Sequence, residues 1–154
     1  MLDKMYPFYA AILAMAIAQG LKPLTYYLIN KEWDPVQIFA SGGMPSSHTA
    51  LVSSLALAVG LVEKFSSTIF AVTLAFSLII IFDACNVRYY AGQNIALTKK
   101  LIDDLNELGY LKTDDPIYHK KMKEVLGHTY LQAFGGIIVG LLTSYIYYLT
   151  FVGS

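Results

Sequence analysis

Four stretches of the chain carry almost no charged residues and are long enough to be membrane-spanning helices. They cover residues 6–22, 47–63, 66–82 and 129–151. A helix needs about 20 mostly apolar residues to cross the bilayer core, with about 17 as the lower limit. The pattern therefore predicts an all-α bundle of about four transmembrane helices, which forms one membrane-embedded domain over residues 1–154.

Local signals mark the ends of these stretches. The first ends at Lys22-Pro23, where proline disturbs a helix. Glu63-Lys64 predicts a turn between the second and the third. Tyrosines gather near the end of the fourth, as they do at membrane–water interfaces.

The first stretch has two interpretations. Ala-Ile-Ala at residues 16–18 resembles a signal-peptidase site after an apolar run. Asp3, however, offsets Lys4 in front of that run, whereas a signal peptide has a positive start. We therefore expect a retained helix.

Two segments are too polar to cross the membrane. Residues 31–44 contain Trp33, Pro35 and a glycine pair, which predicts a partly embedded connector. Residues 83–127 form a long polar insert with a predicted short helix at 118–125. An amphipathic helix is predicted within it, because leucines recur at helical spacing at Leu97, Leu101, Leu105 and Leu108.

The cations predict the orientation in the membrane. Lysine and arginine concentrate in short cytoplasmic loops, whereas acidic residues contribute little to orientation. Under the four-span topology two cations, Lys4 and Lys64, lie on one face, and the other nine lie on the opposite face. We therefore expect the insert to be cytoplasmic and both termini to lie outside.

Composition excludes several classes of protein. Hydrophobic residues make up 56% of the chain and charged residues 14%, against roughly 25% charged in soluble domains. The mean hydropathy is +0.51. Eleven basic residues balance eleven acidic ones, so no global positive field points to nucleic acid. Cys85 is the single cysteine, which excludes an intramolecular disulfide.

Ionisable residues stand at the predicted span boundaries and share one face. Placing such groups in lipid costs several kcal/mol, so each suggests a function. Two cations and two imidazoles at one depth predict an anion site, and phosphate is the natural anion. The residues are Lys22, His48, Asp83, Arg88 and His128.

The segment from Ser41 to Ala50 supports a phosphate site independently. Its paired glycines allow the backbone to approach a ligand closely. Pro45 suits the first turn of a helix, and Ser46 or Ser47 can cap it. A helix N-terminus offers free N–H groups to phosphate oxygens. His48 then lies in the first turn, where it can donate a proton to a leaving oxygen.

A second motif surrounds His128. His128 and Gln132 are four residues apart and share one helical face. An acceptor at Gln132 can hold the Nδ1–H group and leave Nε2 free, as partners of catalytic histidines do. Arg88 can bridge two phosphate oxygens through its planar guanidinium.

These motifs resemble the divergent branch of the type 2 phosphatidic acid phosphatase family, which is related to acid phosphatases and vanadium-dependent haloperoxidases. The resemblance rests on Gly-Gly-Met-Pro-Ser-Ser-His-Thr-Ala at 42–50, Asp-Ala-Cys-Asn-Val-Arg at 83–88 with Ala91-Gly92, and Leu-Gly-His-Thr at 126–129. It runs over nearly the whole chain. It implies hydrolysis of phosphate esters through a phosphohistidine, without a metal or cofactor.

The resemblance also implies a role for each site residue. His128 would be the nucleophile, His48 the general acid, and Gln132 the residue that orients His128. The phosphate would be held by Lys22, Gly43, Ser46, Ser47 and Arg88.

The chain departs from the family pattern at three places. The long insert separates Arg88 from His128, which usually lie close together in sequence. Gln132 stands where a carboxylate is usual; in a hydrolase triad the comparable loss costs about 10⁴ in rate. Asn86 replaces a common glycine, and the role of Asp83 stays open.

The expected substrate is a lipid phosphate of the phosphatidylglycerophosphate, phosphatidate or prenyl phosphate type. It would be bound at the cytoplasmic face of a bacterial plasma membrane, among membrane lipids, and a homodimer is compatible with so few spans. Two rival hypotheses remain. One is a lipid-phosphate binding or transport protein with weakened chemistry. The other is a metal hydrolase that uses His48, His128 and Asp83. Lys22 could also simply extend toward the interface, and Arg88 could anchor the topology.

Overall fold

The computed structural model describes residues 2–40, 42–109 and 129–152, and all regular elements in these ranges are helices. The α-helices are α1 (Leu2–Asn30), α2 (Ser47–Glu63), α3 (Thr68–Cys85), α4 (Val87–Glu107) and α5 (Tyr130–Phe151). A short 3-10 helix, η1 (Pro35–Phe39), lies between α1 and α2. The prediction of an all-α membrane bundle is confirmed.

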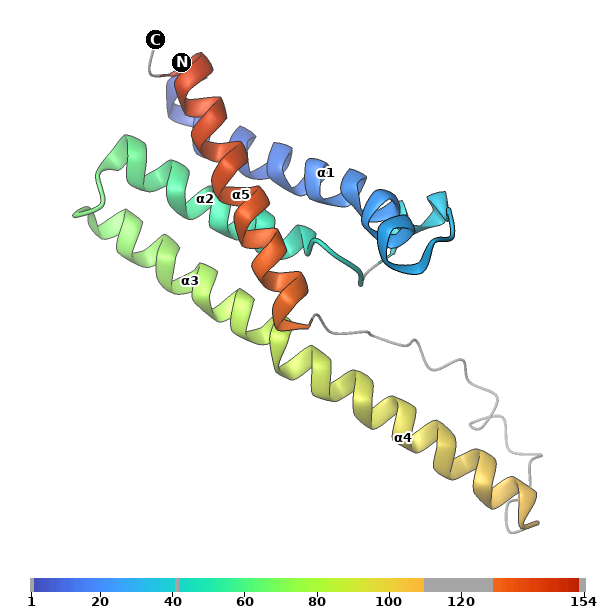
Figure 1. Ribbon diagram of the computed structural model, residues 1–154. Helices are drawn as coiled ribbons and strands as arrows, with labels where there is room; N and C mark the ends of the chain where they lie inside the picture. The colour runs from blue at the N-terminus through green and yellow to red at the C-terminus, as the bar shows by residue number, and fades with distance from the viewer. Residues whose placement is uncertain (1, 41, 110–128, 153–154) are drawn as a thin grey trace.

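The helices form a bundle in which α2 is central. Figure 1 shows α2 between α1 and α3, with α5 crossing it, and α2 packs most extensively against α5 and α1. Three helical stretches within the described residues are long and apolar enough to cross a membrane: 5–30, 68–107 and 130–151. Helix α2 is apolar but has only 17 residues, which is the lower limit for a span.

The interior of the bundle is made mostly of small residues, whereas many large apolar residues point outward. Ala10, Ala14 and Ala18 are buried on one face of α1 and recur every fourth residue. Phe76, Ile79 and other large residues of α3 are more than half exposed. A membrane bundle has this distribution because lipid accepts large apolar side chains while small ones let helices approach closely.

Among the described helices, α2 and α5 pack most extensively, and their backbones approach closely. Gly136 and Gly140 of α5 face the hydroxyls of Thr49 and Ser53 on α2, and a Cβ atom at either glycine would overlap these oxygens and nearby carbonyls. The Thr49 hydroxyl donates to the Ala133 carbonyl at 3.1 Å. Glycine is therefore required at this crossing for space, as in other small-residue helix contacts.

Two further hydroxyl contacts fix the other helices. The buried Tyr6 hydroxyl of α1 donates to the Ser144 carbonyl near the end of α5, at 2.8 Å. The Ser77 hydroxyl of α3 donates to the Val52 carbonyl of α2, at 3.0 Å. The N-terminal end of α1 therefore lies beside the C-terminal end of α5.

The first predicted boundary was wrong. Helix α1 continues through Pro23 to Asn30 instead of ending at Lys22-Pro23. Gln19, Lys22 and Thr25 bind the connector on both sides of the proline, so tertiary contacts hold the helix together there. Pro45 was also expected in the first turn of α2, but it precedes the N-cap Ser46 and lies outside the helix.

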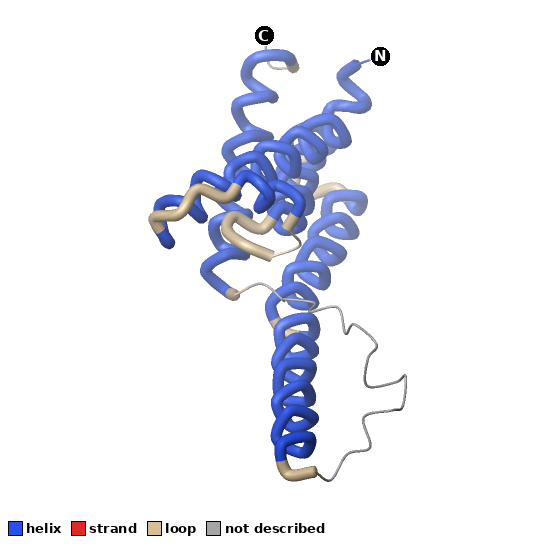
Figure 2. The backbone as a smooth tube through the Cα atoms, turned by 90° about the vertical axis from the view of Figure 1, so that its right-hand side faces the viewer, coloured by secondary structure: helices blue, strands red, loops and turns tan. Residues whose placement is uncertain are grey.

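The insert begins differently from the prediction as well. Asp83 belongs to α3, and α4 begins directly after Asn86, ten residues before the first leucine of the predicted amphipathic helix. Figures 1 and 2 show that α4 continues the direction of α3 and extends beyond the other helices. Leu97, Leu101 and Leu108 are largely exposed there. The predicted helix at 118–125 lies outside the described residues.

The glycine requirement at the α2–α5 crossing can be tested with a matched pair of substitutions. Gly136→Ala should destabilise the protein by about 1–3 kcal/mol, because the added methyl group has no space. Gly20→Ala is the control, since nothing lies within 4 Å of its new Cβ and alanine favours a helix. Thermal unfolding in detergent measures both. Equal midpoints for the two variants would contradict the packing argument.

Candidate functional site

The connector that leads to the glycine pair is held by two polar side chains of α1. Gln19 Nε2 donates to the Ile38 carbonyl at 2.6 Å and to the Ala40 carbonyl at 3.3 Å. Lys22 Nζ donates to the same Ala40 carbonyl at 2.7 Å. These contacts place the glycine pair against α1.

The Lys22 side chain packs against the glycine pair. Its side chain is buried at 2% exposure, and its Cδ atom is 3.8 Å from the position that a Gly43 Cβ would take. Gly43 has φ +90°, a conformation that favours glycine. The ammonium group has three donors, and one of them supports the connector. The phosphate-binding role of Lys22 and Gly43 stays a prediction.

The first turn of α2 is covered by the first turn of α5. Ser46 caps α2, with its hydroxyl oxygen accepting from the Thr49 amide at 3.4 Å. The Ser46 amide donates to the Gln132 carbonyl of α5 at 3.0 Å. Ser46 and Ser47 are both buried, whereas His48 in the same turn is exposed. The helix start predicted at this motif is present.

A cavity of about 260 Å³ lies where three distant segments meet. The segments are the glycine pair, the first turns of α4 and the first turn of α5. The described residues that line the cavity are Gly42, Gly43, Tyr89, Gly92, Gln93, Ala96, Thr129 and Gln132. The chain thus brings its three motifs to one end of the bundle.

Two of the remaining predicted site residues, Arg88 and His128, directly precede lining residues in the chain. The backbone of Arg88 is in the first turn of α4, next to Tyr89, but its side chain is outside the described part. His128 lies outside the described residues and precedes Thr129. Asp83 is half-buried near the end of α3. Lys22, Ser46, Ser47 and His48 are not among the described lining residues.

The structure gives Gln132 a contact that the sequence interpretation missed. Its Oε1 atom accepts from the Thr129 amide at 3.1 Å, while the Thr129 hydroxyl accepts from the Gln132 amide at 3.4 Å. This reciprocal pair is a capping box, and its signal is a threonine followed three residues later by glutamine. Gln132 therefore helps to cap the N-terminus of α5. Its role in orienting His128 stays a prediction.

The cavity wall on α4 was also missed. Tyr89, Gly92, Gln93 and Ala96 have the spacing i, i+3, i+4 and i+7, so they share one face of α4. That spacing was present in the sequence, but the leucines farther along α4 gave the stronger pattern. Only the packing of α5 against the α3–α4 junction shows that this face is turned toward the glycine pair.

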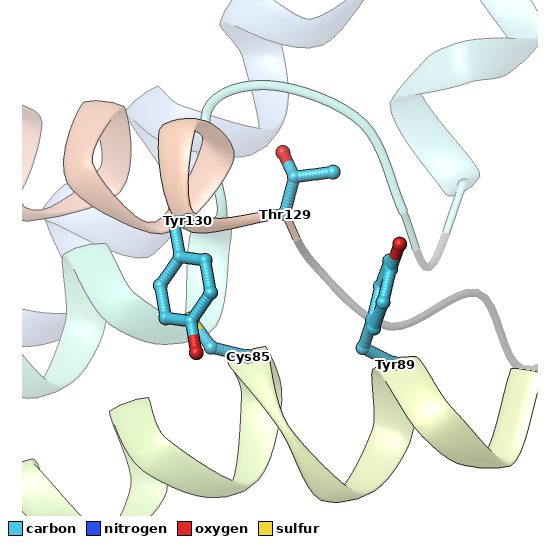
Figure 3. A pocket seen from close by; sticks show the side chains of 4 residues that line it. All are labelled: Cys85, Tyr89, Thr129 and Tyr130. Atoms are coloured by element: carbon cyan, nitrogen blue, oxygen red, sulfur yellow. The ribbon is translucent and has the colours of Figure 1, made fainter.

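A smaller cavity of about 150 Å³ adjoins this wall. Figure 3 shows the described side chains that line it: Cys85 of α3 and Tyr89 of α4 on one side, and Thr129 and Tyr130 at the start of α5 on the other. The Tyr130 hydroxyl donates to Asn86 Oδ1 at 3.1 Å. This bond joins α5 to the junction between α3 and α4.

Comparison with known proteins shows the family to which the chain belongs. Residues 4–143 match the model of the divergent PAP2 family, and the chain belongs to this family. It is an integral membrane protein. The chain is 33% identical over 142 residues to "Uncharacterized membrane protein YuiD" of Bacillus subtilis (strain 168). The matched region covers 89% of this chain and 90% of that protein. No solved structure matches the chain.

The capping box can be tested at Gln132. Gln132→Leu removes the acceptor for the Thr129 amide and should destabilise the start of α5 by about 0.5–2 kcal/mol. Gln132→Glu keeps an acceptor that is common in capping boxes and should retain the stability. Amide hydrogen exchange at the start of α5 measures the effect. Gln93→Leu is a control that lines the same cavity, and equal exchange in both leucine variants would contradict the capping role.

Proposed function

We propose that the protein is a membrane-integrated, metal-independent phosphatase that hydrolyses a lipid phosphate through a phosphohistidine. The observation that carries this proposal is the cavity lined by the glycine pair and the first turns of α4 and α5. Tyr89 and Thr129 both line the cavity. In the chain, Tyr89 directly follows Arg88, and Thr129 directly follows His128. Three motifs that are separate in sequence thus adjoin one space of suitable size for a phosphate group.

The proposed chemistry is a double displacement at phosphorus. A His128 nitrogen attacks the phosphorus atom while the bond to the lipid oxygen breaks, and His48 protonates that oxygen. Water then hydrolyses the phosphohistidine, releases inorganic phosphate and regenerates His128. Lys22, Arg88 and the amides near Gly43 would stabilise the charge on the phosphoryl oxygens, which is the main catalytic effect in phosphoryl transfer. Ser46 and Ser47 would also line the bound phosphate.

Two features support a lipid substrate. The cavity lies at the end of a bundle whose outer surface is formed by large apolar side chains. A phosphorylated lipid has its charged head at the same boundary. The excess of cations on this side favours the cytoplasmic leaflet. Phosphatidylglycerophosphate, phosphatidate and prenyl phosphates or diphosphates all have the required chemistry.

One observation favours a second function, that of a lipid-phosphate binding or transport protein. Gln132 is neutral, and its side-chain oxygen accepts the Thr129 amide. It therefore lacks the charge by which a carboxylate would stabilise a histidine cation. A protein with this residue could hold a phosphate group and turn it over slowly or not at all.

Phosphate release from purified protein in detergent separates the two functions. His128→Ala should abolish release from phosphatidate, phosphatidylglycerophosphate and prenyl phosphate, because the nucleophile is lost. His48→Ala should reduce release by about 10²–10⁴-fold, the usual contribution of a general acid. His119→Ala is the control, because it removes the third histidine, which has no role in the proposed site.

The alternatives give different results in the same assay. Wild-type protein that binds vanadate but releases no phosphate from any of these lipids would favour the binding protein. Inhibition by a chelator would favour a metal hydrolase. Undiminished turnover by His128→Ala would exclude the phosphohistidine.

A further inference from the structure

An apolar groove of about 310 Å³ lies along the membrane-spanning part of α3. Leu74, Leu78 and Ile81 of α3 form one side, and Ile137 and Leu141 of α5 form the other. Leu57 and its neighbours on α2 form the base. The groove exists because α3 and α5 both pack on α2 but contact each other only slightly.

The two hydroxyl groups in the groove are already used by the helices. The Ser53 hydroxyl donates to the Thr49 carbonyl at 2.6 Å, and the Ser77 hydroxyl donates to the Val52 carbonyl at 3.0 Å. Neither serine therefore needs a polar partner from a ligand. The groove consequently presents a hydrocarbon surface along its length.

Along α3 and α4 the smaller cavity lies between the groove and the candidate site. Ile81 at the end of the groove is four residues before Cys85, which lines the smaller cavity, so the two are neighbours on one face of α3. The smaller cavity shares Tyr89 and Thr129 with the cavity beside the glycine pair. The groove, the smaller cavity and the cavity beside the glycine pair therefore follow one another along the side of α3 and α4 that faces α5.

Two phenylalanines close the far end of the groove. Phe65 and Phe70 pack edge to face, with 5.1 Å between their ring centres, and both line the groove. From Phe70 to Ile81 the groove follows about 16 Å of α3, at about 1.5 Å per residue. That is about half of a bilayer core of about 30 Å.

We propose that this groove holds a hydrocarbon chain of the phosphorylated lipid whose head occupies the cavity beside the glycine pair. The proposal rests on the proposed function for the position of the head, and adds the residues that select the chain. The order of the three spaces along α3 and α4 favours a lipid chain over a partner helix, because one amphiphile can reach the cavity beside the glycine pair and the groove together. Leu74 lies in the middle of the groove and is its central specificity-determining residue.

Lipid binding in a turnover-deficient background tests the groove separately from the chemistry. In His128→Ala protein, dioleoyl phosphatidate should bind at least about tenfold more tightly than dibutyryl phosphatidate, because only the longer chains reach the groove. Leu74→Trp fills the groove and should remove this preference. Ile79→Trp is the matched control: it adds the same ring on α3 at a residue that is 63% exposed and is not among the groove residues. It should keep the preference.

Each result decides the proposal. Loss of the preference in Leu74→Trp alone supports the groove, even if the wild-type protein releases no phosphate and the phosphatase proposal fails. An unchanged preference in Leu74→Trp, or an equal loss in Ile79→Trp, overturns the groove while phosphate release can still stand. Equal affinity for both lipids before any substitution in the groove also overturns it.

Discussion

The close contact between α2 and α5 is the constraint on which the rest of the structure depends. Gly136 and Gly140 allow the backbones to approach until the Thr49 hydroxyl of α2 reaches the Ala133 carbonyl of α5. In lipid there is little hydrophobic force between helices, so close packing and hydrogen bonds must hold them together. The same contact brings the start of α5 onto the start of α2, where the Ser46 amide binds the Gln132 carbonyl. The position of the candidate site follows from this crossing.

The site is thus assembled from helix starts and from a connector with no regular structure at the glycine pair. The first turns of α4 and α5 provide most of its wall, and α1 positions the glycine pair through Gln19 and Lys22. The groove arises at the same time, because α2 separates α3 from α5 as it holds them. The cavity beside the glycine pair and the apolar groove lie along the same side of α3 and α4, which suits an amphiphilic ligand. The packing therefore places the groove and the site in succession along α3 and α4.

Much of the architecture could be predicted because membrane insertion depends on local composition. The apolar run at 47–63 coincides with α2, and the run at 129–151 contains α5, since about 20 apolar residues favour lipid wherever they occur in the chain. The glycine-serine-histidine motif likewise indicated a helix start. The end of α1 was missed, because proline weakens a helix locally and only tertiary contacts show that the helix continues.

By itself the sequence determined the fold class, the family and the motifs that meet at one end of the bundle. Only the tertiary structure decided which small residues form the crossing, that Lys22 supports the connector, and that Gln132 caps α5. The physical reason is the range of the interactions. Hydropathy and capping propensity act over a few residues and can be summed along the chain, whereas a helix contact depends on two surfaces far apart in sequence.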